Sequence, residues 1–170
     1  MFFKKKSKIN NLSASKILNN EDLKSKIEEY QLLLREKTDE KYRCQFSTII
    51  IFGKNCVTRH DVYHVFSDEQ GYHFVYYERG EDGYHRVSVE LLDIIFWVLQ
   101  RAIKDMAGCY ELDNRDSDFC IKRIDTRRVM FEKELELWGI LGEEFQKKAK
   151  LEISEILKNA PYSDNLQDDE

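Results

Sequence analysis

Four histidines and a cysteine lie close together in the middle of the chain, in a stretch rich in β-branched and aromatic residues. Imidazoles near a thiolate are ligands that zinc accepts, and the group comprises Cys56, His60, His64, His73 and His85. In the strand pairing given below, His64 and His73 are diagonal neighbours on one face and His85 points to the other. That face then lacks a third ligand. We therefore expect no metal site, and half-buried histidines on a sheet.

Two other groups resemble catalytic ones in residue type. Cys109 stands near the end of an apolar helical stretch with no histidine positioned as its base, so we expect a structural thiol. Four carboxylates follow within ten residues, but basic residues surround them, which favours a salt-bridged turn over acid–base catalysis. A hydrolase that uses Glu111 and Arg115 is the third and weakest of the functions considered. The sequence predicts no enzyme and no cofactor.

Aromatic residues and arginines supply most of the binding energy at protein–protein interfaces. The candidate partner-binding residues of this kind are Tyr77, Arg79, Arg86 and Trp97. On a helical wheel Trp97 falls within a polar stripe, near Arg101 and Lys104. A tryptophan packed between its own helix and a charged neighbouring helix would give the same pattern, so both interpretations stay open. Strand aromatics can also stack nucleic-acid bases, although the basic groove typical of such sites is not evident.

A set of charged residues flanks the end of the same helical stretch. It consists of Glu111, Arg115, Asp125, Arg127 and Arg128. We interpret these residues as a partly buried structural ion network that ties two helices together. Removing one member of such a pair leaves its partner buried without a counter-charge, which destabilises the fold. A contribution to partner binding is the alternative.

The spacing of apolar residues predicts the elements that position these side chains. Apolar residues from Glu21 to Lys37 recur at steps of three and four, which predicts an amphipathic helix. Four short stretches of β-branched and aromatic residues follow and predict an antiparallel meander. They span residues 46–52, 62–66, 72–77 and 84–89.

Two four-residue turns, at 68–71 and 80–83, set the expected register by pairing residue 67 with 72 and residue 79 with 84. One face, expected to be core, then carries Tyr63, Val65, Phe74, Tyr76, Val87 and Val89. The other face, expected to be partly solvated, carries His64, His73, Val75, Tyr77, Arg86 and Ser88.

The rest of the chain is expected to be helical. Residues 89–112 are apolar over most of the helical circumference, which predicts a buried central helix. A second helix, capped by Asp125 or Thr126, ends near Leu141, and a third runs over residues 143–159. The predicted class is α+β: an antiparallel four-stranded β-meander with an N-terminal helix and three C-terminal helices packed on one face. We expect a loose arm at 1–19, a single domain at 20–162 and an acidic tail at 163–170.

Composition excludes several classes of protein. With 35% charged residues, one proline and 42% hydrophobic residues, the chain of 170 residues is not of a disordered or low-complexity type. Its net charge of −5 gives no general attraction to nucleic acid or anionic lipid. The four cysteines lack CxxC spacing, and no leader-like or membrane-spanning stretch is evident. These features favour a cytoplasmic protein with free thiols, and they leave its oligomeric state open.

Several short motifs occur in a characteristic order. They begin with the run from Gly71 to Gly80 and continue through Leu91-Leu92, Phe96-Trp97-Val98 and Tyr110-Glu111-Leu112. They end with Arg127-Arg128, Leu135-Glu136-Leu137 and Pro161-Tyr162. In this order the chain resembles the immunity protein 63 family of polymorphic-toxin immunity proteins over about residues 71–164. Residues 113–124, which include Cys120, depart from the family pattern.

The resemblance implies a bacterial cytoplasmic protein without enzymatic activity. Such a protein binds a cognate secreted or contact-delivered toxin and blocks its active site or substrate path. The alternative is a non-enzymatic binding or adaptor module of another class, in which the half-exposed sheet face engages a peptide or a nucleic acid.

Overall fold

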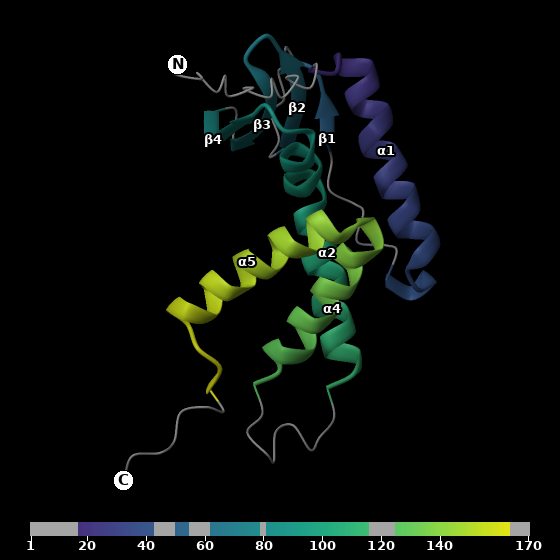
Figure 1. Ribbon diagram of the computed structural model, residues 1–170, viewed down its shortest axis with the longest axis vertical. Coiled ribbons are helices and arrows are strands. Elements are labelled where there is room, and N and C mark those ends of the chain that lie inside the picture. Colours follow the sequence, from purple (N-terminus) through teal and green to yellow (C-terminus); the bar gives the residue numbers. More distant parts are fainter. Residues whose placement is uncertain (1–16, 43–49, 55–61, 79–80, 116–124, 164–170) are drawn as a thin grey trace, which may run out of the picture.

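The computed structural model describes residues 17–42, 50–54, 62–78, 81–115 and 125–163 (Figure 1). The elements are, in order, α1 (Asn20–Lys37), β1 (Ile50–Phe52), β2 (Val62–Asp68), β3 (Gly71–Glu78), β4 (Glu81–Ser88), α2 (Leu91–Asp113), α4 (Arg127–Leu141) and α5 (Glu143–Asn159). The α+β class is confirmed, and the predicted helices agree with these bounds to within two residues at each end. Within the described residues, no helix combines the length and the apolar character needed to cross a bilayer.

Local sequence explains where the helices begin. Asn19 caps α1, since its side-chain oxygen accepts a hydrogen bond from the backbone N–H of Asp22 at 2.9 Å. At the start of α4, Thr126 holds the N-cap position, but the carboxylate of Asp125 accepts the N–H of Arg127. Gly142 ends α4 with a φ of 134°, a conformation that favours glycine, and α5 begins at the next residue.

The four strands lie in the order β1-β2-β3-β4, and the sheet is mixed. β2, β3 and β4 pair antiparallel as predicted, whereas β1 runs parallel to β2. The prediction of a purely antiparallel meander is therefore wrong for the first strand. A parallel pair needs a connection that returns the chain to the starting end of the strand. β1 has only three residues, so the chain has only a short distance to retrace.

The predicted register is confirmed for one strand pair and wrong for the other. Ser67 pairs with Tyr72, as predicted. Tyr84, however, pairs with Tyr76 and not with residue 79. An offset of three positions exchanges the two faces of β4, because side chains alternate along a strand. Val87 and Val89, predicted to be core, are therefore 46% and 56% exposed. Arg86, predicted on the other face, points with Phe74 to the side that faces α2.

α2 is the centre of the molecule. It contacts β3 and β4 on one side and packs against α4, which in turn contacts α5. Figure 1 shows the sheet near one end of α2, with α4 and α5 grouped around its lower half and α1 running along one side. The interior between α2 and α4 is aromatic: the rings of Phe96 and Trp138 stack at 4.2 Å, and both side chains are fully buried.

Candidate functional site

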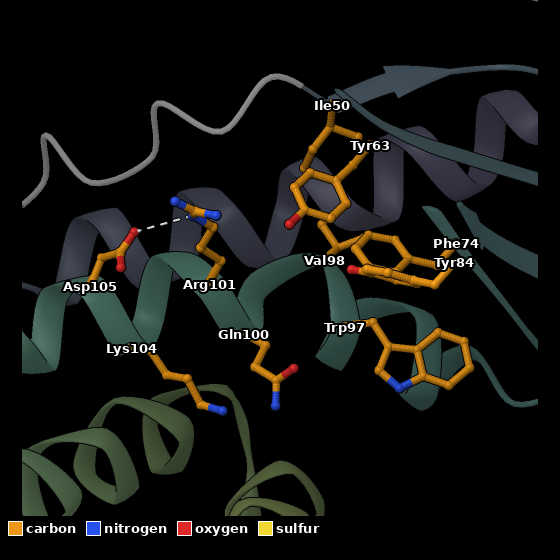
Figure 2. Close-up of a pocket in the computed structure, with 10 residues that line it drawn as sticks. All are labelled: Ile50, Tyr63, Phe74, Tyr84, Trp97, Val98, Gln100, Arg101, Lys104 and Asp105. Atoms are coloured by element: carbon orange, nitrogen blue, oxygen red, sulfur yellow. Dashed lines mark ion pairs between the residues drawn. The ribbon is translucent and has the colours of Figure 1, made fainter. Parts of the chain in front are cut away.

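A cavity of about 350 Å³ opens between the sheet and α2, and Figure 2 shows the side chains around it. We call it the aromatic groove. Its sheet wall consists of Ile50, Tyr63, Phe74 and Tyr84. Its helix wall consists of Trp97, Val98, Gln100, Arg101, Lys104 and Asp105. Cavities of roughly 300 Å³ and more are large enough to hold a ligand or an inserted side chain.

Cross-strand packing builds the sheet wall. Tyr63 on β2 stacks on Phe74 of β3 with ring centroids 5.1 Å apart, and Tyr84 on β4 lies 6.0 Å from Phe74. The register places these side chains on one face, since Tyr63 pairs with Tyr76 and Tyr76 pairs with Tyr84. Burial and the neighbouring Tyr63 raise the pKa of Tyr84 to about 12. The Tyr84 hydroxyl therefore stays protonated at physiological pH and can donate a hydrogen bond.

Trp97 and Arg86 meet at the edge of this wall. The ring of Trp97 lies 6.4 Å from that of Phe74. The guanidinium carbon of Arg86 lies 5.7 Å from the centre of the Trp97 ring and 5.3 Å from that of Tyr84. Trp97 is partly exposed, and Arg86 is exposed. Among the described residues, no carboxylate forms an ion pair with Arg86. The result is a solvent-accessible stack of aromatic rings and one arginine.

The far end of the groove is polar. Arg101 Nε lies 3.7 Å from Asp105 Oδ2, and both side chains are largely exposed. A hydrogen bond with the Tyr63 hydroxyl and the charge of Asp105 raise the pKa of Arg101, so its positive charge is secure. Lys104 Nζ lies 3.9 Å from Glu152 Oε2, and Gln100 also donates to that oxygen. Glu152 thereby connects the helix wall of the groove to α5.

The structure brings together two of the four candidate partner-binding residues. Arg86 and Trp97 are neighbours at the groove. Tyr77 lies on the opposite face of the sheet, where its ring meets that of His64 edge-on at 4.7 Å. Arg79 lies outside the described residues. The sequence placed Arg86 on the same face as Tyr77, and the altered register of β4 overturns that placement.

The same register also changes the histidines. His85 was predicted to point away from His73, but His73 Nδ1 and His85 Nε2 are 2.8 Å apart. On the other side of the ring, His73 Nε2 donates to Asp68 Oδ1 at 2.7 Å. Hydrogen bonds from the backbone N–H of Gln70 and from His73 hold the pKa of Asp68 well below its usual range. Within the described part of the chain, no three metal-binding side chains are placed to share an ion. Cys56 and His60 lie outside that part.

The charged residues at the end of α2 form a close pair. Both guanidinium nitrogens Nε and Nη2 of Arg115 lie 2.8 Å from the carboxylate oxygens of Glu111. The Glu111 side chain is only 8% exposed. Hydrogen bonds from Arg115 and from the Thr126 hydroxyl lower the pKa of Glu111. Through the Thr126 hydroxyl, Glu111 therefore links the end of α2 to the start of α4.

A second set connects the start of α4 to the segment after α5. Arg127 Nη2 lies 2.6 Å from Asp125 Oδ2, and the same guanidinium donates to the carbonyls of Ala160 and Pro161. Hydrogen bonds from Arg127 and Ser163 hold the pKa of Asp125 well below its usual range. The guanidinium of Arg128 lies 3.9 Å over the ring of Tyr162. That these residues serve structure and not partner binding stays a prediction.

The part of the chain that forms most of this site matches a known family. Residues 67–155, just over half of the chain, match the family model described as Immunity protein 63. The chain belongs to the immunity protein 63 family. It is thus an immunity protein of the polymorphic toxin systems and not an enzyme. Comparison with curated proteins and with solved structures gives no further match.

The family match covers the helix wall of the groove completely and the sheet wall in part. Phe74 and Tyr84 lie within the matched residues, as does Arg86, whereas Ile50 and Tyr63 precede them. This immunity protein therefore builds its groove partly from residues that precede the matched region.

Sequence analysis did not identify Tyr84 or Tyr63 as site residues. The signal that could have found Tyr84 is Gly83, which has no partner in the register because Tyr76 pairs with Tyr84 and Tyr77 with Asp82. A side chain at Gly83 would lie 2.8 Å from the ring of Tyr76. An isolated glycine in a strand often marks such a bulge. Reading it that way would have placed Tyr84 and Arg86 on the face toward α2.

One further missed residue is a buried acid. Glu134 on α4 is 2% exposed, and its Oε2 has no hydrogen-bond partner. Burial raises the pKa of Glu134, against the opposing effect of the positive charge of Lys104. In the sequence Glu134 follows a lysine and precedes Leu135-Glu136, so nothing in the pattern distinguished it from the exposed acids of the same helix.

Proposed function

We propose that this immunity protein binds one cognate toxin domain and blocks its active site or substrate path, with the aromatic groove as the centre of the contact surface. Family membership supports the toxin as the partner. The observation that carries the choice of surface is the accessible stack of Arg86, Tyr84 and Trp97 beside an open cavity. We further propose that the protein acts in the cytoplasm of the bacterium that produces the toxin.

The geometry of Trp97 favours a role in binding over one in packing between helices. Its ring contacts Phe74 and Arg86, which belong to strands, and its side chain packs against the core but stays partly exposed. Tryptophan, tyrosine and arginine are the residues most enriched among those that dominate binding energy. In this protein the Trp97 and Tyr84 rings and the Arg86 guanidinium are stacked before the partner arrives, so little side-chain entropy is lost on binding.

The groove alone is too small to be the whole interface. Stable protein–protein interfaces bury roughly 1,600 Å² in total. A cavity of about 350 Å³ fits the anchor at the centre of such an interface. The surrounding surface of β4 and α2 would then provide the polar rim that excludes water.

Co-expression tests this proposal. The partner is the carboxy-terminal domain of the large secreted protein that we expect the neighbouring gene to encode. We expect the immunity protein to restore growth of cells that express this domain and to co-purify with it at a ratio of one to one. A toxic domain that still kills the cells and does not co-purify with the folded immunity protein would contradict the proposal.

A further inference from the structure

The aromatic groove is locally basic, although the chain as a whole is acidic. Three cations lie on it or at its edge, Arg86, Arg101 and Lys104. Two carboxylates face them, Asp105 in the groove and Glu152, which pairs with Lys104. The whole chain carries a net charge of −5. A protein with this overall charge has no general reason to gather cations around a cavity. The local excess therefore points to the chemistry of whatever the groove receives.

Two of these cations, Arg86 and Arg101, are available to a partner. Arg86 forms no ion pair among the described residues and is held over the Trp97 and Tyr84 rings. The pair of Arg101 with Asp105 is 65% and 45% exposed at its two side chains. Ion pairs as exposed as this contribute little, so a carboxylate from a partner can displace Asp105 at small cost.

The apolar part of the groove lies directly beside Arg86. The rings of Phe74, Tyr84 and Trp97 form one continuous wall, with centroids of neighbouring rings 6.0 to 6.4 Å apart. Such a wall favours an apolar or aromatic side chain, because it offers a large area that water must otherwise cover. A ligand that satisfies both parts has an apolar group and a negative charge within one or two residues of each other.

We propose that the aromatic groove recognises an acidic segment of the toxin. An apolar or aromatic side chain of that segment fills the cavity between the Tyr84 and Trp97 rings, and a neighbouring carboxylate pairs with Arg86. The planar guanidinium suits a carboxylate, because it can donate two parallel hydrogen bonds. Stacking on Trp97 holds it in place beforehand. This inference rests on the proposed function and adds the chemical class of the docking segment.

Charge reversal at Arg86 tests the inference. Arg86→Glu changes the net charge from −5 to −7, and so does Lys150→Glu at an exposed position of α5 that does not line the groove. We expect Arg86→Glu to raise the Kd for the toxin domain at least about 30-fold, as loss of an interfacial charge pair predicts. Lys150→Glu controls for overall charge and is expected to change the Kd little.

Reversal on the toxin side completes the test. Each aspartate and glutamate of the toxin domain is changed to lysine in turn, and binding is measured against Arg86→Glu. At least one such change is expected to restore a large part of the lost affinity. Circular dichroism checks folding, and Arg86→Gln, which removes the charge without adding a new one, provides a milder variant with a smaller expected loss.

The outcomes separate this inference from the function on which it rests. Equal losses for Arg86→Glu and Lys150→Glu, or no restoring change in the toxin, would overturn the acidic segment while toxin binding stands. Binding of a labelled single-stranded oligonucleotide in the groove, in place of the toxin domain, would also overturn it. Failure of the unaltered chain to bind the toxin domain would contradict the proposed function itself and the inference with it.

Discussion

Glu134 shows how burial alone couples stability to pH. Its carboxyl is buried beside α2, and desolvation raises its pKa above the ordinary value of 4.5. The folded chain therefore binds a proton at Glu134 more tightly than the unfolded chain does. As the pH rises from about 4.5 through the folded-state pKa, the free energy of unfolding falls, because the unfolded state releases this proton more readily.

Replacing the carboxyl by an amide removes this dependence. We expect Glu134→Gln to raise the thermal midpoint near neutral pH, and we expect the gain to shrink as the pH approaches 4.5. Melting curves across this range provide the measurement. Glu132→Gln, at an exposed position of the same helix, is the control and is expected to change little at any pH. A gain that is the same at all pH values would mean that burial does not perturb the Glu134 carboxyl.

Arg127 tests the structural interpretation of the charged residues. Arg127→Ala leaves the Asp125 carboxylate, whose side chain is 8% exposed, without its principal donor. We expect the free energy of unfolding to fall by about 1–3 kcal/mol, the cost of an unsatisfied buried polar group. Urea denaturation measures it. Lys147→Ala removes a pair that is exposed on both sides and should cost far less. An equal, small effect of both changes would show that the Asp125–Arg127 pair does not stabilise the fold.

Residue types predicted part of the site. Trp97 was recognised because a large aromatic ring in a polar helical stripe is unusual, and the structure places it at a cavity. Arg86 was recognised by type but placed on the wrong face. Tyr84 was not recognised, because its face depends on the bulge at Gly83, which the alternation of residues along the strand does not show.

Among the elements, the turn between β2 and β3 determines how closely β4 can approach β3. Gly71 has a φ of 136°, and a Cβ atom at this position would lie 2.5 Å from the backbone oxygen of Ser88. Gly71 thus serves both the turn after β2 and the close approach of β4. Since β4 carries Tyr84 and Arg86, this contact also helps to position the groove.

Two glycine substitutions separate the strain at Gly71 from the close contact. Gly53 has a φ of 121° and open space around its Cβ position, so Gly53→Ala is expected to cost only backbone strain, about 1–3 kcal/mol. Gly71→Ala adds a clash with backbone and should lower the free energy of unfolding by more. Denaturant titration of both variants measures the difference. Equal losses would show that the approach of Ser88 to Gly71 is not needed for the fold.

The elements differ in how well their sequences specify them. The helices were predictable because their apolar residues repeat over four or more turns, and α5 begins and ends at the predicted residues. The register of β2 and β3 followed from a short turn. The pairing of β3 with β4 depends on the irregularity next to Tyr76, and the direction of β1 depends on a crossover. Neither leaves a periodic signal.

At the scale of the whole molecule, overall charge and local charge have different signs. The net charge of −5 would favour encounter with a basic partner over long distances, an effect that salt weakens. The groove instead gathers Arg86, Arg101 and Lys104 at one cavity. A partner with a basic surface and an acidic docking segment satisfies both. Composition alone could therefore not have given the chemistry of the contact.

The affinity of the Trp97→Ala variant for the toxin domain is the sharpest test of toxin binding at the aromatic groove. Titration calorimetry compares it with the unaltered protein and with Leu112→Ala, which shortens an exposed apolar residue at the other end of α2. We expect binding weaker by at least about 2 kcal/mol for Trp97→Ala, a nearly unchanged thermal midpoint, and no loss for Leu112→Ala. Unaltered affinity of the folded Trp97→Ala protein, with a large fall in its thermal midpoint, would show that Trp97 is a core residue and not a binding anchor.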